Sequence, residues 1–201
     1  RFRYRGIEFR IFLPGRHNVD NALLAVMLGE RLGYPLTAMA RALAGFRGLR
    51  RRLELAGRCG GVTVYDDYAH NPAKIAAAWT AVAPHHGRVL AVWRPHGYAP
   101  LALLFDELVQ TFSRLAREQD RLFLLPVYYA GGRAERRATS EALAAALRGR
   151  GTACELAADY EALHARLTAE ARAGDAVLWM GARDPELSVQ ARRLAGALGP
   201  S

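Results

Sequence analysis

Residues 62–72 read Val62-Thr63-Val64-Tyr65-Asp66-Asp67-Tyr68-Ala69-His70-Asn71-Pro72. The first four are β-branched or aromatic and predict a short buried strand over residues 62–65. Pro72 suits the first turn of a helix, and the apolar spacing continues that helix to Val82. Two carboxylates, a phenol and an imidazole are therefore expected in the turn at the carboxyl end of a strand, which is the edge where open α/β sheets bind ligands.

Strands and helices alternate along the chain beyond residue 53. Such alternation is typical of a mostly parallel sheet with helices on both faces, so we expect a Rossmann-like α/β fold. The predicted strands are 62–65, 88–93, 121–127, 153–156 and 176–180, and the predicted helices are 72–82, 101–117, 140–147, 160–173 and 186–195.

The first 52 residues follow a different pattern. Residues 1–13 predict a hairpin, and helices are expected at 18–32, where Asn18 is a candidate cap, and from residue 36 or 37 to about residue 44. A segment of this size buries little core by itself. We therefore expect residues 1–52 to be a small α+β remnant of a preceding domain, and residues 53–201 to be a separate α/β domain.

The charge of the chain is strongly positive. Its formal net charge is +9, carried by 27 arginines and the single lysine Lys74. The arginine clusters at 50–52 and 133–137 are not interleaved with the aromatic side chains that stack on nucleobases, so we expect no nucleic-acid partner. A nucleic-acid binder driven by charge alone stays an alternative.

Membrane and metal sites are not indicated either. No apolar run reaches the roughly 18 residues that span a bilayer, and no signal-peptide segment follows Arg1, so we expect a cytoplasmic protein without a membrane partner. The two cysteines, Cys59 and Cys154, lack the spacing of metal ligands, and no metal site is expected within this chain.

Four polar or glycine-containing loops follow the predicted strands, at residues 66–72, 94–98, 128–132 and 181–184. The carboxyl ends of parallel strands meet at one edge of a sheet, so these loops are expected to converge. One crevice would then hold a set of polar side chains from several strands. The alternative is that Asp66 or Asp67 only caps the next helix and that the histidines are exposed loop residues. The expected set is Asp67, His70, His96, Tyr128 and Arg183.

Two further segments carry ligand-binding side chains. Asn18 and Asn21 offer the donor and acceptor that read an adenine edge, or they serve only as helix caps. Arg51 and Arg52 either bind a phosphate through the paired N–H donors of their guanidinium groups or form a solvent-exposed run of charged residues. Neither a phosphate loop nor a Gly-x-Gly-x-x-Gly turn is present in the sequence, so any nucleotide site is only half built in this chain.

Six segments, taken in order, resemble the Mur ligase family, the ATP-dependent amino-acid ligases of peptidoglycan precursor synthesis. Among its branches, the resemblance is strongest to the one that joins L-alanine to UDP-N-acetylmuramate. The segments are Gly15-Arg16-His17-Asn18-Val19-Asp20-Asn21-Ala22, the junction at residues 46–54, Asp66-Asp67-Tyr68-Ala69-His70-Asn71-Pro72, Pro95-His96-Gly97-Tyr98, Tyr129-Ala130-Gly131 and Met180-Gly181-Ala182.

The resemblance implies a protein of three domains, of which this chain is the end of the central ATPase domain and the whole Rossmann-like third domain. It implies ATP and Mg²⁺ as cofactors, with the magnesium ligands and catalytic lysines upstream of this fragment. It also implies a UDP-sugar acid and an amino acid as substrates, and the upstream domains of the same chain as partners. The fragment alone is expected to be inactive.

The resemblance also implies roles for individual residues. Asn18 and Asn21 would lie near adenine, Arg52 on the nucleotide phosphates, and Asp67 on the ribose hydroxyls. The amino acid or the acyl phosphate would face Tyr68 and the catalytic residues His70 and His96. The alternative to a ligase is a stand-alone Rossmann-like module that binds a nucleotide or a partner.

The chain departs from the family pattern at several positions. Gly97 and Pro100 stand where the family has arginines, which are the usual donors to the amino-acid carboxylate, so Arg94 or Arg183 is expected to replace them. Asn71 stands in place of a second histidine and Lys74 in place of a glutamate. Arg183 itself replaces a glycine.

Overall fold

The computed structural model describes residues 1–129, 131 and 138–198. The chain divides into two compact units, residues 1–49 and residues 50–201. The expected functional loops belong to the second unit, and Asn18 and Asn21 belong to the first.

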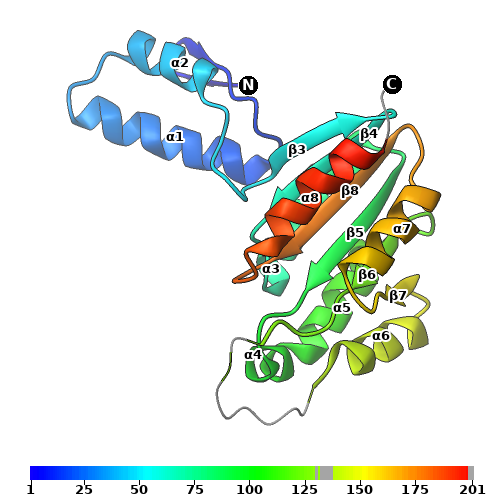
Figure 1. The fold of residues 1–201 in the computed structure, drawn as a ribbon. Helices are drawn as coiled ribbons and strands as arrows, with labels where there is room; N and C mark the ends of the chain where they lie inside the picture. The colour runs from blue at the N-terminus through cyan, green and yellow to red at the C-terminus, as the bar shows by residue number, and fades with distance from the viewer. Residues whose placement is uncertain (130, 132–137, 199–201) are drawn as a thin grey trace. The chain divides into compact units, whose positions relative to one another are not determined.

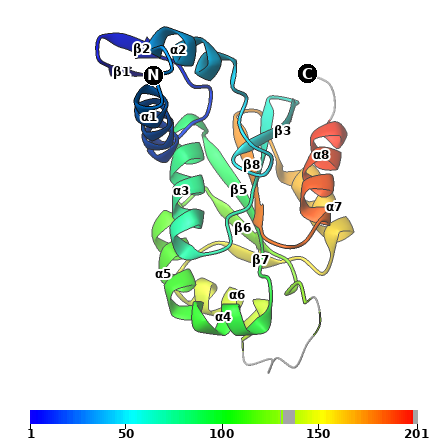
Figure 2. The ribbon, with the colours of Figure 1, turned by 90° about the vertical axis from the view of Figure 1, so that its left-hand side faces the viewer.

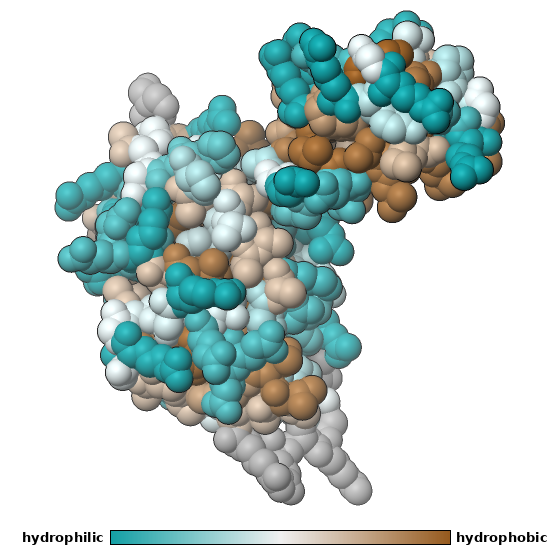
Figure 3. All heavy atoms as spheres, turned by 180° about the vertical axis from the view of Figure 1, so that it is seen from behind, coloured by the Kyte–Doolittle hydropathy of each residue, from teal (hydrophilic) through white to brown (hydrophobic). Residues whose placement is uncertain are grey.

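The first unit is a hairpin followed by two helices. Strands β1 (Phe2–Tyr4) and β2 (Ile7–Phe9) pair antiparallel, and helices α1 (Arg16–Arg31) and α2 (Leu36–Gly45) follow, which confirms the hairpin and both helices. This small unit leaves apolar side chains in contact with solvent, which Figure 3 shows as exposed hydrophobic atoms. The most exposed leucines of α1 and its end are Leu24, Leu28 and Leu32, with 66%, 60% and 68% of their surfaces accessible.

The proposed cap at Asn18 is wrong. Helix α1 begins two residues earlier, after Gly15, whose φ of 96° and ψ of 139° are not helical. The side chain of Asn18 lies inside the first turn, and its Nδ2 donates to the carbonyl of Pro14 at 2.6 Å. The amide therefore bonds to the preceding backbone and does not accept from the helix N–H groups.

The second unit is built on a six-stranded sheet with helices on both faces (Figure 1). The strand order is β3-β4-β8-β5-β6-β7, and every neighbouring pair is parallel except β3 and β4. This confirms the Rossmann-like α/β fold. The strands are β3 (Glu54–Cys59), β4 (Val62–Asp67), β5 (Arg88–Arg94), β6 (Arg121–Leu124), β7 (Cys154–Leu156) and β8 (Asp175–Gly181).

The helices form one layer on each side of the sheet, as the turned view shows (Figure 2). One layer holds α3 (Pro72–Val82), α5 (Phe105–Leu115) and α6 (Ser140–Gly149), and the other holds α7 (Tyr160–Glu170) and α8 (Glu186–Ala197). The central strand β8 supplies both cores because its side chains alternate between the two faces. Leu178 packs with the first layer, and Val177 and Trp179 pack with the second.

Several predicted boundaries are corrected by the structure. The strand predicted at 62–65 runs on to Asp67, so both aspartates are strand residues. The strand predicted at 121–127 ends at Leu124. The helix predicted at 101–117 is two helices, α4 (Tyr98–Leu103) and α5, because Leu104 between them has φ −104° and ψ 7°. Strand β3 was not predicted.

Helix α3 begins where the sequence predicts. The side chain of Asn71 accepts a hydrogen bond from the Lys74 N–H at 3.0 Å, and Pro72 occupies the first turn. This is the usual arrangement of an N-cap followed by proline. The alternative in which Asp66 or Asp67 caps this helix is therefore wrong.

Candidate functional site

The strand-end loops converge at the carboxyl edge of the sheet, as predicted. Strand β8 lies between β4 and β5, and the register pairs Asp67 with Met180 and Arg94 with Gly181. The loops after β5 and β6 join directly, because the Gly97 N–H donates to the Tyr128 carbonyl at 2.9 Å. Of the loop predicted at residues 128–132, Ala130 and Gly132 lie outside the described residues.

Two imidazoles meet at this edge. The rings of His70 and His96 lie 5.0 Å apart at an interplanar angle of 87°, and the Tyr68 ring lies 5.5 Å from His70. Nδ1 of His70 is 2.9 Å from the Tyr68 carbonyl oxygen. A carbonyl only accepts, so neutral His70 carries its proton on Nδ1 and presents Nε2 as an acceptor.

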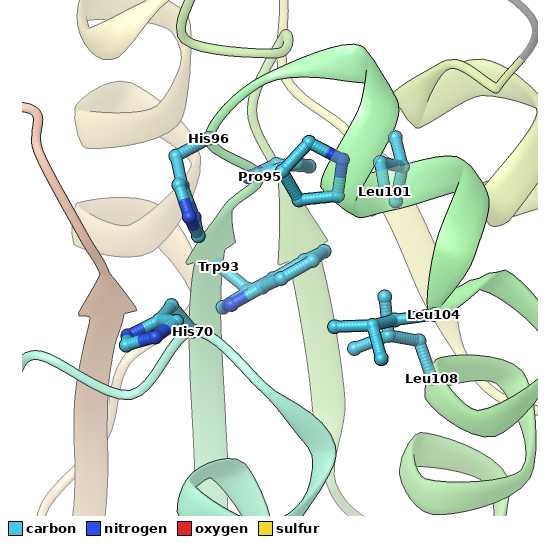
Figure 4. Close-up of a pocket in the computed structure, with 8 residues that line it drawn as sticks. His70, Trp93, Pro95, His96, Leu101, Leu104 and Leu108 are labelled. Carbon is cyan, nitrogen blue, oxygen red and sulfur yellow. The ribbon is translucent and has the colours of Figure 1, made fainter.

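A small apolar hollow adjoins the two histidines. It is open to solvent on one side and has a volume of about 190 Å³ with that open space included, and Figure 4 shows the Trp93 indole between the imidazoles and the leucines. Burial lowers the pKa of His96, and electrostatic repulsion from the nearby His70 ring and from Arg183 lowers it further. The neutral form of His96 is therefore favoured. The lining residues are His70, Trp93, Pro95, His96, Pro100, Leu101, Leu104 and Leu108.

The two aspartates are buried and hydrogen-bonded. Asp67 Oδ2 accepts from the Leu53 N–H at 2.8 Å, and Oδ1 accepts from the Ala69 N–H at 2.7 Å. Asp66 accepts from the Ser188 hydroxyl and lies 3.7 Å from Arg51 Nε. Burial raises the pKa of both carboxyl groups. Asp67 thus fixes the backbone just before β3 and the backbone of the turn after β4, with one hydrogen bond on each oxygen.

Arg94 is held inside the protein by a polar network. Its Nη1 donates to Asp184 Oδ2 at 2.5 Å and to the Tyr160 hydroxyl at 3.1 Å, and its Nε donates to the Pro126 carbonyl at 3.1 Å. The Tyr160 hydroxyl also donates to Asp184 at 2.5 Å. The guanidinium predicted to bind substrate is therefore already paired with a buried carboxylate.

The other arginines of this edge differ in exposure. Arg51 lies with its guanidinium 4.8 Å from the centre of the Tyr68 ring and donates to the Gly181 carbonyl at 2.6 Å. Arg52 and Arg183 are exposed. In the first unit Asn21 is also exposed, while Asn18 is bonded to Pro14 as described.

Residues 51–183 match the model of the family described as "Mur ligase, glutamate ligase domain". The chain belongs to the Mur ligase family. Its resemblance to this family, expected from six short motifs, is thereby confirmed.

Curated relatives of this Mur ligase chain are UDP-N-acetylmuramate–L-alanine ligases. The protein from Agrobacterium fabrum is 38% identical over 172 residues, which cover 85% of this chain and 36% of the relative. The protein from a Synechococcus species is 38% identical over 177 residues, which cover 88% of this chain and 36% of the relative. The chain thus spans little more than a third of the length of these relatives.

Solved structures agree with the fold. The UDP-N-acetylmuramate–alanine ligase of Thermotoga maritima superimposes with a TM-score of 0.75 at 25% identity, over 96% of this chain and 40% of that one. MurF of Acinetobacter baumannii superimposes with a TM-score of 0.69 at 20% identity, over 94% of this chain and 39% of that one. The second likeness supports the fold alone.

Sequence reasoning did not assign some residues that shape this candidate site. Tyr160 begins a helix 66 residues after Arg94, and Asp184 lies 90 residues after it, so no local pattern pairs them. Ser188 is 122 residues from Asp66. The strand-end loop that contains Asp184 was the one available signal.

The described residues contain neither a cluster of metal ligands nor a membrane-spanning helix. Across residues 1–129, 131 and 138–198 there is no group of three or more His, Cys, Asp or Glu side chains placed to hold a metal ion. Among the helices of the same residues, none is long and apolar enough to cross a membrane.

Proposed function

We propose that this chain is the carboxyl-terminal part of an ATP-dependent ligase that joins L-alanine to UDP-N-acetylmuramate in peptidoglycan precursor synthesis. The observation that carries the proposal is the identity of 37–38% to such ligases over 85–88% of the chain. The chain spans 36–38% of their length, so we propose that it is inactive without further domains. The proposed division of the chain is 1–52 for the end of the central domain and 53–201 for the third domain.

The proposed reaction suits the two histidines. ATP transfers its γ-phosphoryl group to a carboxylate, which gives an acyl phosphate and ADP. The amine of alanine then attacks the acyl carbon, inorganic phosphate leaves, and the amine loses a proton. The amine must be neutral to attack, and Nε2 of His70 is an acceptor held in place by the Tyr68 carbonyl. His96 lies beside it with the neutral form favoured, so it can donate to or accept from the substrate.

The amino-acid substrate is proposed to bind at Tyr68, His70 and His96, over the apolar hollow. That hollow is lined by Trp93 and leucine side chains, which suit a small apolar group such as the methyl of alanine. A domain that closes over this edge would keep water from the acyl phosphate.

The proposed ATP contacts are Asn18 and Asn21 at the adenine, Arg52 at the phosphates and Asp67 at the ribose. Arg52 has an exposed guanidinium that suits a phosphate. Each Asp67 oxygen accepts one backbone N–H and so keeps a further lone pair for a hydroxyl. The Mg²⁺ that accompanies ATP is proposed to bind upstream residues. The upstream domains are the proposed protein partners, and the proposed location is the cytoplasm.

The experiment that tests this function is a product assay. The full-length gene product is incubated with ATP, Mg²⁺, UDP-N-acetylmuramate and L-alanine, and the products are separated and weighed by mass spectrometry. The matched control is the 201-residue chain alone. We expect the alanyl product and ADP only from the full-length protein. If nucleotide binds but no product forms with any amino acid, the chain is a binding module and the proposal is wrong.

A further inference from the structure

Arg183 is an exposed cation next to the histidine pair. It lies two residues beyond Gly181, which pairs with Arg94, and His96 lies two residues beyond Arg94. The two loops therefore leave neighbouring strands at the same level, and the charge of Arg183 lowers the pKa of His96. Among the described residues, no carboxylate forms an ion pair with Arg183, in contrast to Arg94 and Asp184.

Two other arginines of this edge already have partners. Arg94 is paired with Asp184, and Arg51 bonds to the Gly181 carbonyl and lies near Asp66. The guanidinium of Arg52 is exposed and lies 6.0 Å from the Tyr68 ring centre, and Arg52 is the residue proposed above to bind the ATP phosphates. Residues 95–100, which contain His96, have no arginine or lysine.

The backbone of Arg183 is held in a strained conformation. Its φ of 64° lies in the left-handed region, which costs a side-chain-bearing residue free energy relative to glycine. Asp184 fixes the conformation, because its Oδ1 accepts the Glu186 N–H at 2.9 Å and its own N–H donates to the Ala182 carbonyl at 2.8 Å. Strained residues cluster at active sites and ligand-binding loops, although three other non-glycine residues in the described part of the chain, Arg5, Arg51 and Leu53, also have positive φ. Because glycine would fit this backbone better, the presence of arginine at position 183 indicates a role for its side chain.

We propose that Arg183, and not Arg94, binds the carboxylate of the incoming amino acid, while Arg94 and Asp184 hold the loop that presents it. The inference rests on the ligase function proposed above. A guanidinium suits this role because its two parallel N–H groups match the two oxygens of a carboxylate.

The test uses the full-length protein with saturating ATP and UDP-N-acetylmuramate. The variants are Arg183→Gly, Arg183→Gln and Arg183→Lys, and the control is Arg150→Gln, an exposed arginine between α6 and β7 at the opposite edge of the sheet. Each is assayed with L-alanine and with L-alaninamide, which keeps the amine and methyl but lacks the carboxylate.

We expect Arg183→Gly and Arg183→Gln to lower kcat/KM for L-alanine by roughly 10- to 100-fold, with the KM for ATP changed by less than about twofold. The wild-type preference for alanine over alaninamide should disappear in both. Arg183→Lys should retain part of that preference. The thermal midpoint of Arg183→Gly should not fall, because glycine relieves the backbone strain.

Three results would contradict the inference and leave the proposed function standing. It is wrong if Arg183→Gly keeps the preference for alanine over alaninamide, or if the KM for ATP rises instead of that for alanine, which would place Arg183 on a phosphate. It is also wrong if Arg150→Gln produces the same loss. A wild-type protein inactive with every amino acid would refute the proposed function itself, and the inference with it.

Discussion

The buried pair of Arg94 and Asp184 is expected to stabilise the second unit strongly. Asp184→Ala removes a carboxylate whose side chain is 2% exposed and leaves the guanidinium, 20% exposed, without its anion. It also removes the acceptor of the Tyr160 hydroxyl and of the Glu186 N–H. Breaking a buried pair by removing one partner costs about 3–5 kcal/mol. Because Arg94 keeps some solvent contact, we expect about 3 kcal/mol, which lowers the melting temperature of a protein of this size by about 6–12 °C.

The assay is urea unfolding followed by tryptophan fluorescence at pH 7. Trp79, Trp93 and Trp179 are all buried in the second unit, so the signal reports that unit. Arg94→Met should also destabilise the protein. The double variant should cost less than the sum of the two single variants by about 2 kcal/mol, because it leaves no unpaired charge. Strictly additive costs, or a loss below about 1 kcal/mol in Asp184→Ala, would refute the reasoning.

Four further predictions concern the same edge of the sheet. His96→Ala in the full-length protein should lower turnover with the amino acid by roughly tenfold or more while changing the KM for ATP little, and an unchanged rate with every amino acid would contradict its role. Asp67→Ala should raise the KM for ATP, which ATP titration measures. It should also destabilise the protein more than Asp67→Asn, since the asparagine amide keeps one acceptor for the two backbone N–H groups. Equal destabilisation by the two variants in calorimetry would count against a stabilising role of these two hydrogen bonds. Asn71→Ala should cost about 1 kcal/mol and Asn71→Ser much less, because serine still caps the helix; equal melting temperatures would disprove this cap. Burial lowers the pKa of His96, so the folded protein binds a proton on His96 less readily than the unfolded chain does, and the stability should fall as the pH drops below about 6.5. In His96→Gln, the urea midpoint should fall less between roughly pH 7 and 5 than in the wild type. Identical pH profiles for the two proteins would contradict this prediction.

Local signals were sufficient where a short segment determines its own conformation. The bounds of α3 were predicted without error, because Asn71 supplies the cap, Pro72 the first turn and the apolar spacing the rest. The parallel sheet followed from alternating strands and helices, and its topology brought the strand-end loops together as expected.

Strand β3 could not be predicted because its pairing defines it. Its sequence, Glu54-Leu55-Ala56-Gly57-Arg58-Cys59, has no β-branched residue and no alternation that favours a strand. It forms against β4 with a register shift between Leu55 and Gly57. A Cβ on Gly57 would lie 2.7 Å from the Cβ of Ala195, so the glycine allows close packing against α8. These determinants lie in distant parts of the chain.

The hydrogen-bond and ion-pair partners of individual site residues could not be predicted from the sequence either. The strand pattern placed Arg94 at the correct edge but could not show that Asp184 and Tyr160 neutralise and orient it. Asp67 was predicted at the correct edge of the sheet, although it ends strand β4 and does not lie in the turn, and its bond to the Leu53 N–H depends on how the chain enters β3. Such contacts depend on tertiary packing, whereas the position of a residue along a strand depends mainly on local sequence.

The most direct test of the account is ATP-dependent phosphate release by the full-length protein with UDP-N-acetylmuramate and a panel of single amino acids. We predict release that requires both substrates, is fastest with L-alanine, and is strongly reduced by His96→Ala. Phosphate release that is independent of the amino acid, or fastest with a large or charged amino acid, would contradict the assignment of this edge as the binding site of alanine.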